Sequence, residues 1–250
     1  KIDTWGSWQW ATMAGGTQGY DVPYSIDVGP QGNAFIAGYF QFTSTFGTHS
    51  MTSSGGSDVF IAKISQQGDW MWSLDAGGGS SSQANSVQVD SQGNVFVAGS
   101  FSAGISFGNL TYSAGGTENS FIARANDLGN SASWEWALQL SSSNSNSAQD
   151  LAFDANQDLF VTGEFRGTAS FGNSALTSSG NQDVYVASIL ANGNWAWARI
   201  AGSGSEDVGL GIEMGSEGDL YVTGSFLQNT ITFGSVDVAT SGGFDSFVAK

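Results

Sequence analysis

The chain has 250 residues and a formal net charge of −16 at pH 7, from six Lys and Arg against twenty-two Asp and Glu. Proteins that bind nucleic acid or anionic membranes cluster Lys and Arg at the contact, so the composition excludes both as partners. No apolar run approaches the roughly 20 residues that a helix needs to cross a bilayer, and we therefore expect no membrane insertion. The absence of cysteine rules out disulfides and thiolate metal sites.

Four copies of one repeat account for nearly the whole chain. Successive Trp-x-Trp motifs begin 62, 64 and 61 residues apart, and a Phe-Gly pair recurs at the same step. The motifs are Trp8/Trp10, Trp70/Trp72, Trp134/Trp136 and Trp195/Trp197, and the Phe-Gly pairs begin at Phe46, Phe107, Phe171 and Phe233. A fixed period of this kind is the signature of a repeat architecture. We expect one domain, residues 1–250, with repeats at about 17–76, 77–140, 141–201 and 202–250 plus 1–16.

Each repeat is predicted to contain four strands and a small hairpin. In the second unit, the hydrophobic pattern and the turn residues give strands over 59–64, 70–75, 86–90 and 95–101, followed by a hairpin around Phe107. No segment shows a sustained 3.6-residue period, so we expect almost no helix. Val95–Ala98 is apolar on both faces and must be covered on both sides. Four-stranded sheets stacked radially, with the tryptophan strand outermost, meet that demand.

The two termini are predicted to share one blade. Lys1–Gly16 aligns with the tryptophan strand of the later repeats, whereas Asp245–Lys250 aligns with Asp58–Lys63 and stops where a tryptophan strand would follow. We therefore expect the N- and C-terminal strands to complete one sheet, which would leave no open edge in the ring. A start at Lys1 fits either a processed mature protein or a segment of a longer one.

Three motifs carry a family resemblance. Gly93–Phe101, Phe107–Gly116 and Asp58–Lys63 together resemble the SBBP-type bacterial β-propeller repeat, and the similarity extends over all four units. The resemblance implies one propeller blade per repeat, in extracellular or surface-anchored bacterial proteins that commonly carry more than four repeats, and it supplies no catalytic motif. The expected fold is therefore an all-β, four-bladed β-propeller of four-stranded antiparallel sheets.

The paired tryptophans are the predicted ligand-binding residues, with a structural alternative. Residues i and i+2 of a strand share a face, so Trp8/Trp10, Trp70/Trp72, Trp134/Trp136 and Trp195/Trp197 each present two indoles on one side. Exposed at blade edges, these indoles would stack on sugar rings in several weak sites acting together. Packed between blades, each would bury about 150–250 Å² and hold the ring together. The structural alternative is favoured because large aromatic side chains are mostly buried.

Calcium is the only cofactor that the sequence leaves open. Asp58, Asp183 and Asp245 each stand just before a strand, and Asn119 replaces the Asp in the remaining repeat. These three are the predicted metal ligands, although an Asp that closes a turn through its own backbone is the favoured explanation. The turn Asp90–Asn94 resembles part of a calcium loop but lacks the distal bidentate Glu.

No combination of residues predicts catalysis. His49 is the only histidine, so no Ser-His pair repeats, and the adjacent Glu206 and Asp207 would serve a glycosidase only across a cleft. We expect a non-enzymatic binding or adhesion scaffold, secreted or at the cell surface, with a protein or a glycan as partner and binding loops at 15–24, 77–85, 141–149 and 202–209. Two alternatives stay open, a multivalent lectin and a structural subunit that self-associates by strand exchange. The sequence does not identify the ligand.

Overall fold

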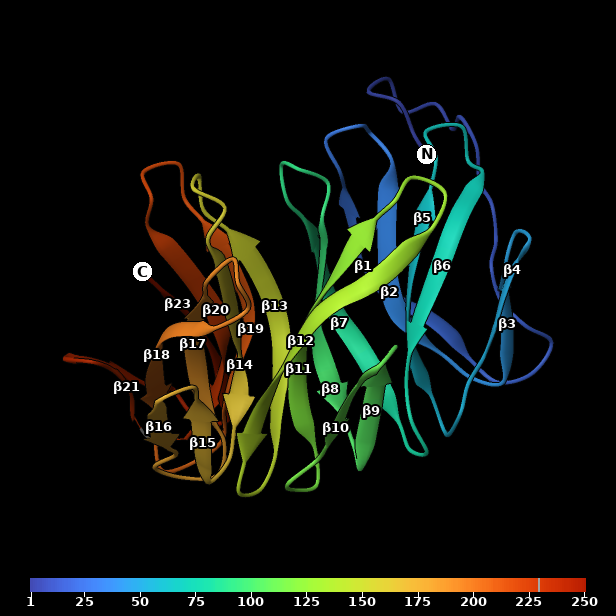
Figure 1. The fold of residues 1–250 in the computed structure, drawn as a ribbon. Helices are drawn as coiled ribbons and strands as arrows, with labels where there is room; N and C mark the ends of the chain where they lie inside the picture. Colours follow the sequence, from blue (N-terminus) through green and yellow to red (C-terminus); the bar gives the residue numbers. More distant parts are fainter. Residues whose placement is uncertain (229) are drawn as a thin grey trace.

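The computed structural model describes residues 1–228 and 230–250, and every regular element within them is a β-strand. No helix in these ranges is long and apolar enough to cross a membrane. Four antiparallel sheets follow one another as the blades of a β-propeller (Figure 1), so the prediction of an all-β, four-bladed propeller is confirmed.

The blades are numbered in chain order, and their strands run outward from the axis. Blade 1 contains β1 (Asp21–Val28), β2 (Ala34–Phe40), β5 (Asp58–Ile64) and β6 (Trp70–Ala76). Blade 2 contains β7 (Ser82–Val89), β8 (Val95–Phe101), β11 (Asn119–Asp127) and β12 (Ala132–Ser142). Blade 3 contains β13 (Asn146–Phe153), β14 (Leu159–Phe165), β17 (Asp183–Ile189) and β18 (Trp195–Gly202). Blade 4 contains β19 (Asp207–Met214), β20 (Leu220–Leu227) and β23 (Phe244–Ala249).

The tryptophan strand is outermost in the first three blades, as predicted. The inner strand β7 begins at Ser82, four residues before its predicted start, because its ladder with β8 continues past a bulge between Ala84 and Ser86. All four inner strands carry a bulge at the same place, and bulges increase local twist. The bulge is therefore a property of the repeat and shapes every blade alike.

The small hairpins of repeats 2 to 4 lean on the outer strand of the preceding blade, and the hairpin of repeat 1 leans on the N-terminal segment. The hairpins are β3–β4 (Thr43–Phe46, His49–Thr52), β9–β10 (Gly104–Phe107, Leu110–Ser113), β15–β16 (Thr168–Phe171, Ser174–Thr177) and β21–β22 (Thr230–Phe233, Val236–Ala239). Gly77 of the segment after β6 forms a bridge with Ser106 of β9, and the fourth hairpin pairs with β18 in the same way. Consecutive blades are thus tied at the rim as well as packed face to face.

The core consists of apolar layers between neighbouring blades. Phe35 and Ile61 of blade 1 pack against Val87 and Val97 of blade 2, and two similar layers join blade 2 to blade 3 and blade 3 to blade 4. The strands β8 and β14, which have a blade on each side, are buried at every residue. This confirms the expectation that these apolar strands are covered on both faces.

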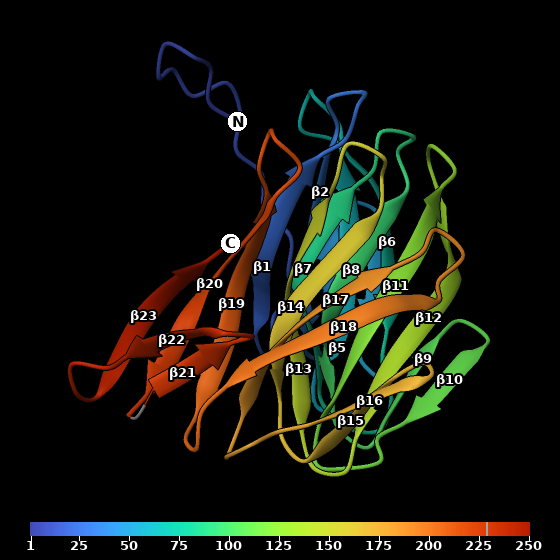
Figure 2. The ribbon, with the colours of Figure 1, turned by 90° about the vertical axis from the view of Figure 1, so that its left-hand side faces the viewer.

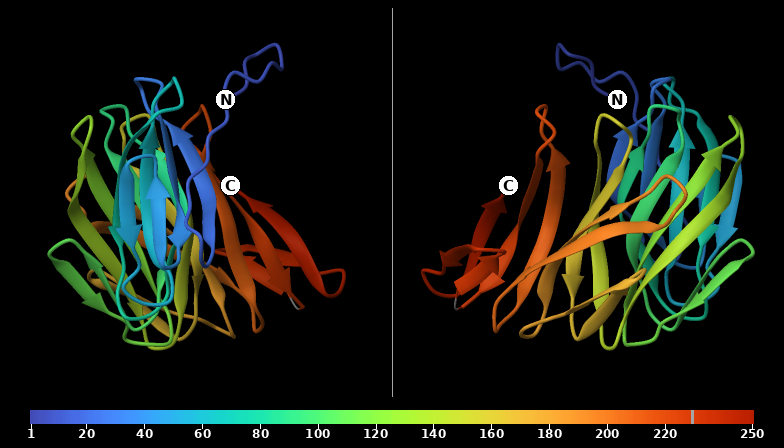
Figure 3. Two further views of the ribbon diagram at one scale, coloured as in Figure 1. Left: turned by 90° about the vertical axis from the view of Figure 1, so that its right-hand side faces the viewer. Right: turned by 60° about the vertical axis from the view of Figure 1, so that its left-hand side comes forward.

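The prediction that both termini complete one blade is wrong. Blade 4 has three strands, and none of the described residues of the N-terminal segment pairs with β23. Residues 10–15 are instead held on blade 1, where Gly15 forms a bridge with Thr45. The sheet of β19, β20 and β23 diverges from β1 (Figure 3). The packing angles at the three interfaces between blades determine the direction of blade 4, and this direction keeps the two termini apart.

Candidate functional site

The eight paired tryptophans are distributed over the blade junctions and do not form one site. Trp72 is 2% exposed and Trp8 is 77% exposed. The other six are half-buried. The two members of a pair lie at different junctions, so the prediction that both indoles share one side of the blade is wrong: Trp72 and Trp134 belong to the layer between blades 1 and 2, and Trp136 and Trp195 to the layer between blades 2 and 3. A bulge within the Trp-x-Trp motif turns the two side chains of a pair to opposite faces. Trp8 is the member of the predicted set whose indole is open to solvent.

The first tryptophan of a pair packs edge-on against the phenylalanine of the Phe-Gly hairpin. Trp70 meets Phe46 with ring centroids 5.2 Å apart at 90°, and Trp134 meets Phe107 at 4.9 Å and 85°. The Trp195–Phe171 contact repeats this geometry at 5.2 Å and 79°. Edge-to-face aromatic pairs add about 0.5–1.5 kcal/mol beyond the area that they bury.

The indole N–H groups of these tryptophans reach backbone of the preceding outer strand. The Trp134 Nε1–H donates to the Asp75 carbonyl oxygen at 2.8 Å, and the Trp70 Nε1–H donates to the Met13 carbonyl oxygen at 3.2 Å. Asp75 and Met13 occupy the same position of the repeat. The Trp134 contact ties blade 2 to blade 1, and the Trp70 contact ties blade 1 to the N-terminal segment. This is the structural role that the sequence offered as an alternative to sugar binding.

The second tryptophan of a pair contacts a turn of the following blade. The Trp72 Nε1–H donates to Asp127 Oδ1 at 3.0 Å, and the same carboxylate accepts from the buried Lys63 ammonium group. At the next junction, Trp136 lies over the turn at Gly193. The predicted sugar-binding role of these tryptophans stays a prediction.

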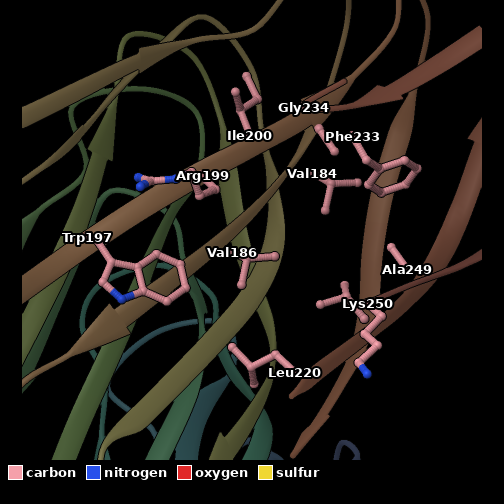
Figure 4. A pocket seen from close by; sticks show the side chains of 12 residues that line it. Val184, Val186, Trp197, Arg199, Ile200, Leu220, Phe233, Gly234, Ala249 and Lys250 are labelled. Atoms are coloured by element: carbon pink, nitrogen blue, oxygen red, sulfur yellow. The ribbon is translucent and has the colours of Figure 1, made fainter. Parts of the chain in front are cut away.

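A groove of about 370 Å³ lies between blades 3 and 4. It is lined mainly by apolar side chains, including Val184 and Val186 of β17, Trp197 of β18, Leu220 of β20 and Phe233 of β21. These side chains surround one hollow, with Trp197 at one end and Phe233 at the other (Figure 4). The groove opens along β23, which is the edge strand of its sheet.

Two cations stand at the groove. The Arg199 guanidinium lies 5.8 Å from the centre of the Trp197 ring. The Lys250 ammonium group pairs with Asp219 at 2.6 Å, and hydrogen bonding to that carboxylate raises the pKa of Lys250. An apolar trough beside an unpaired strand edge can take an extended chain through main-chain hydrogen bonds while large side chains enter the trough.

Of the groove residues, Trp197 belongs to the predicted ligand-binding set, whereas the sequence did not single out the others as a site. Arg199 and Lys250 resemble ordinary solvated charges, and Phe233 belongs to the Phe-Gly period that marks every repeat. One signal could have identified the place: the fourth Phe-Gly pair is the only one with no Trp-x-Trp motif after it in the sequence.

The three predicted calcium ligands lie at the starts of strands in three different blades. Asp58, Asp183 and Asp245 each accept hydrogen bonds from the backbone and hydroxyl of the serine four residues earlier. No group of three or more His, Cys, Asp or Glu residues in the described ranges could hold a metal ion. Burial raises the pKa of Asp183, although the Ser179 hydrogen bonds oppose it. The geometry is that of a side chain closing its own turn.

One buried carboxyl group escaped the sequence reasoning. Burial raises the pKa of Glu164 on β14 to about 8, and the nearby Glu118 and Glu206 add to the shift, whereas hydrogen bonds from Gln149 oppose it. Glu164 does not line the groove between blades 3 and 4. His49 is half-buried at the start of β4, opposite Phe46 in the hairpin.

The predicted binding loops are shorter than expected. Strands extend into each proposed range, so the connections from outer to inner strand in the last three ranges are only residues 77–81, 143–145 and 203–206. Short connections hold the blades rigidly and offer little reach for a ligand. The groove and the open edge of β23 therefore provide more binding surface than these loops.

Comparisons with known proteins give two distant relatives. The chain is 24% identical over 217 residues to the regulatory protein FlaEY of Caulobacter vibrioides. The aligned region covers 79% of this chain and 22% of that protein. It is also 24% identical over 212 residues to an uncharacterized WD repeat-containing protein of Acanthamoeba polyphaga mimivirus, covering 74% of this chain and 15% of the relative. The chain thus spans about a fifth of the length of these relatives or less. No protein-family model matches it.

Proposed function

We propose that this chain is a non-enzymatic protein-binding scaffold whose site is the groove between blades 3 and 4. The observation that carries the proposal is the apolar trough of about 370 Å³ beside the unpaired edge of β23. A partner segment in extended conformation would add a strand to β23 and insert aromatic side chains between Trp197 and Phe233. The affinity would come from main-chain hydrogen bonds and the specificity from the trough.

The relatives support a binding role. WD repeats build propeller blades, and one relative is described as a WD repeat-containing protein. The Gly- and Ser-rich composition and the resemblance to SBBP-type repeats support placement of the protein outside the cell or on its surface. A protein partner fits the groove better than a glycan, because a strand edge recognises a polypeptide backbone.

A labelled peptide tests the proposal. The probe is a fluorescein-labelled copy of residues 66–76, QQGDWMWSLDA, which contains a tryptophan strand of the repeat. Fluorescence anisotropy should show saturable binding to the 250-residue chain, and Val186→Asp in the groove should weaken it by about tenfold or more. Val236→Asp is the matched control, because Val236 is exposed on β22 outside the groove.

Two results would reject the groove as the site. One is equal binding by the Val186→Asp and Val236→Asp variants. The other is equal binding of the peptide and of a version with both tryptophans replaced by alanine. Failure of the peptide to bind the monomeric 250-residue chain would leave no support for a scaffold that acts through this groove.

A further inference from the structure

Blade 4 lacks one aromatic contact that the other repeats make. In those repeats, the Phe-Gly phenylalanine is at most 2% exposed and meets the first tryptophan of the following pair. Phe233 is only half-buried, contacts Phe247 at 4.9 Å and faces the groove. The groove is thus the position that a first tryptophan occupies elsewhere in the molecule.

The matching tryptophan is exposed at the other end of the chain. Trp8 occupies the same repeat position as Trp70, Trp134 and Trp195, yet it is 77% exposed. It lies in a short loop closed by a bridge to Ile2. Figure 2 shows this N-terminal segment rising beyond the end of β1, away from β23. The chain therefore has a position beside Phe233 that lacks its tryptophan, and it has an exposed tryptophan, Trp8, from the equivalent position of the repeat.

The N-terminal segment already makes the contacts of an outer strand, but with blade 1. Trp10 lies over the Gly68 turn as Trp136 lies over the Gly193 turn. The Met13 carbonyl accepts the Trp70 N–H group, as the equivalent carbonyl of β6 does for blade 2. These contacts place residues 10–15 as the outer strand of a blade that would precede blade 1.

The faces at the two ends of the chain are uncovered and apolar. On blade 1, Tyr24, Ile26 and Val28 are 52–65% exposed. On blade 4, Val248 is 77% exposed, although the residue at its position in blade 1, Ile61, is fully buried. Each end therefore presents one half of an inter-blade layer like the three that form the core.

We propose that two copies of this chain join end to end into one ring, in which Trp8 of each copy fills the groove between blades 3 and 4 of the other. The inference rests on the proposed function of the groove and names its occupant. Residues 8–14 of one copy add the fourth strand to β23 of its partner, while the uncovered faces of blades 1 and 4 pack together. Head-to-tail contacts that close at two copies leave no free edge.

The repeat fixes the register of the new strand pair. Ala62 lies opposite Ser73 in blade 1, and Ala187 lies opposite Ala198 in blade 3. The same register places Ala249 of β23 opposite Ala11 of the second copy. By the same equivalence, the Trp8 N–H group would donate to the Ile200 carbonyl, which lies at the groove.

Sedimentation equilibrium of the 250-residue chain gives the first test. We expect a particle of twice the chain mass of 25.9 kDa. Trp8→Ala should weaken association by roughly thirtyfold or more, as expected for a central aromatic anchor. Trp5→Ala is the matched control, because Trp5 is 90% exposed and lies outside the proposed strand. A monomer at every concentration, or a series of ever larger particles, would overturn the closed pair.

Cross-linking tests the register and distinguishes two copies from one. The chain has no native cysteine, so an Ala11→Cys chain mixed with an Ala249→Cys chain should oxidise to a covalent heterodimer. A Thr4→Cys chain, outside the proposed strand, should not cross-link with the Ala249→Cys chain. A disulfide that forms only within a chain carrying both Ala11→Cys and Ala249→Cys would overturn the proposal.

The outcomes separate this inference from the proposed function. If the protein is monomeric and the QQGDWMWSLDA peptide still binds in a Val186-dependent manner, the groove is a protein-binding site and its occupant is not a second copy. If the protein is monomeric and the peptide does not bind, the groove itself is rejected.

Discussion

Replacing Trp72 with alanine tests whether the paired tryptophans hold the blades together. Trp72 is 2% exposed, packs against Phe35 with ring centroids 5.9 Å apart and donates its N–H to Asp127 of blade 2. Truncation of a buried tryptophan to alanine costs about 3–5 kcal/mol, from lost burial and the cavity left behind. For a chain of this length, that loss lowers the melting temperature by roughly 6–20 °C.

Urea titration followed by circular dichroism provides the measurement. The midpoint should fall while the slope stays constant, which marks a change in stability with no change in the surface exposed on unfolding. Trp72→Phe keeps most of the buried area but loses the N–H bond to a carboxylate, so it should cost about 1.5–3 kcal/mol. Trp5→Ala, at a 90% exposed position, should stay within about 0.5 kcal/mol of the parent. A Trp72→Ala cost below about 1 kcal/mol would refute the reasoning.

Three further predictions concern buried groups. Asp127→Ala leaves the buried Lys63 ammonium group unpaired and should cost about 3–5 kcal/mol in urea titrations, part of which Lys63→Met should restore. Gly77→Ala should lower the melting temperature, because its Cβ would lie 1.9 Å from the Asp58 carboxyl carbon. Between the ordinary pKa of 4.5 and the raised value of about 8, folded Glu164 keeps a proton that the unfolded chain releases. The free energy of unfolding should therefore fall by about 1.4 kcal/mol per pH unit in that window, and Glu164→Gln should remove this fall.

Each of these predictions has its own control. Gly79→Ala introduces a Cβ with nothing within 4 Å, so an equal effect at Gly77 and Gly79 would contradict the steric argument. A Lys63→Met change that fails to rescue Asp127→Ala would mean that the lost charge pair is not the cause. For Glu164, the parent and the Gln variant are compared at each pH, and parallel curves would show that another group titrates.

The repeat period predicted most of the fold because it shows which residues of each unit form strands and which of their side chains must be buried. Strand order, the outer position of the tryptophans and the burial of β8 follow from motifs that recur at a constant step. Periodicity states which neighbour a side chain needs, but not whether that neighbour is present. Val28 and Val89 occupy equivalent positions, yet Val28 is 60% exposed and Val89 is half-buried against blade 1.

The closure of the ring could not be predicted from the motifs. The phase of the repeat aligned the N-terminal segment with an outer strand; residues 10–15 form no strand in the structure, although they make contacts with blade 1 like those of the outer strands. Whether that strand meets β23 depends on the angles that accumulate over three packed interfaces, and no local motif encodes that sum. The groove could not be predicted for the same reason, because it exists only where the sheet of blade 4 lacks an outer strand.

The distribution of cations agrees with a covered face on blade 4. The chain has only six Lys and Arg, and three of them occupy one position of the repeat, each over the aromatic ring of the adjacent strand. Lys63 lies 5.5 Å from the Phe35 ring centre, Arg124 lies 5.6 Å from Phe96, and Lys250 lies 5.8 Å from Tyr221.

At the junction of blades 1 and 2 and at that of blades 2 and 3, the following blade covers this cation. The Lys63 side chain is 2% exposed and that of Arg124 is 20% exposed, whereas that of Lys250 is 52% exposed. A cation over an aromatic ring gains about 0.5–1 kcal/mol in water but 2 or more when it is desolvated. The cation–π interaction between Lys250 and Tyr221 therefore reaches its full energy only when another blade covers it. In the proposed pair, the apolar face of blade 1 of the second copy provides this cover.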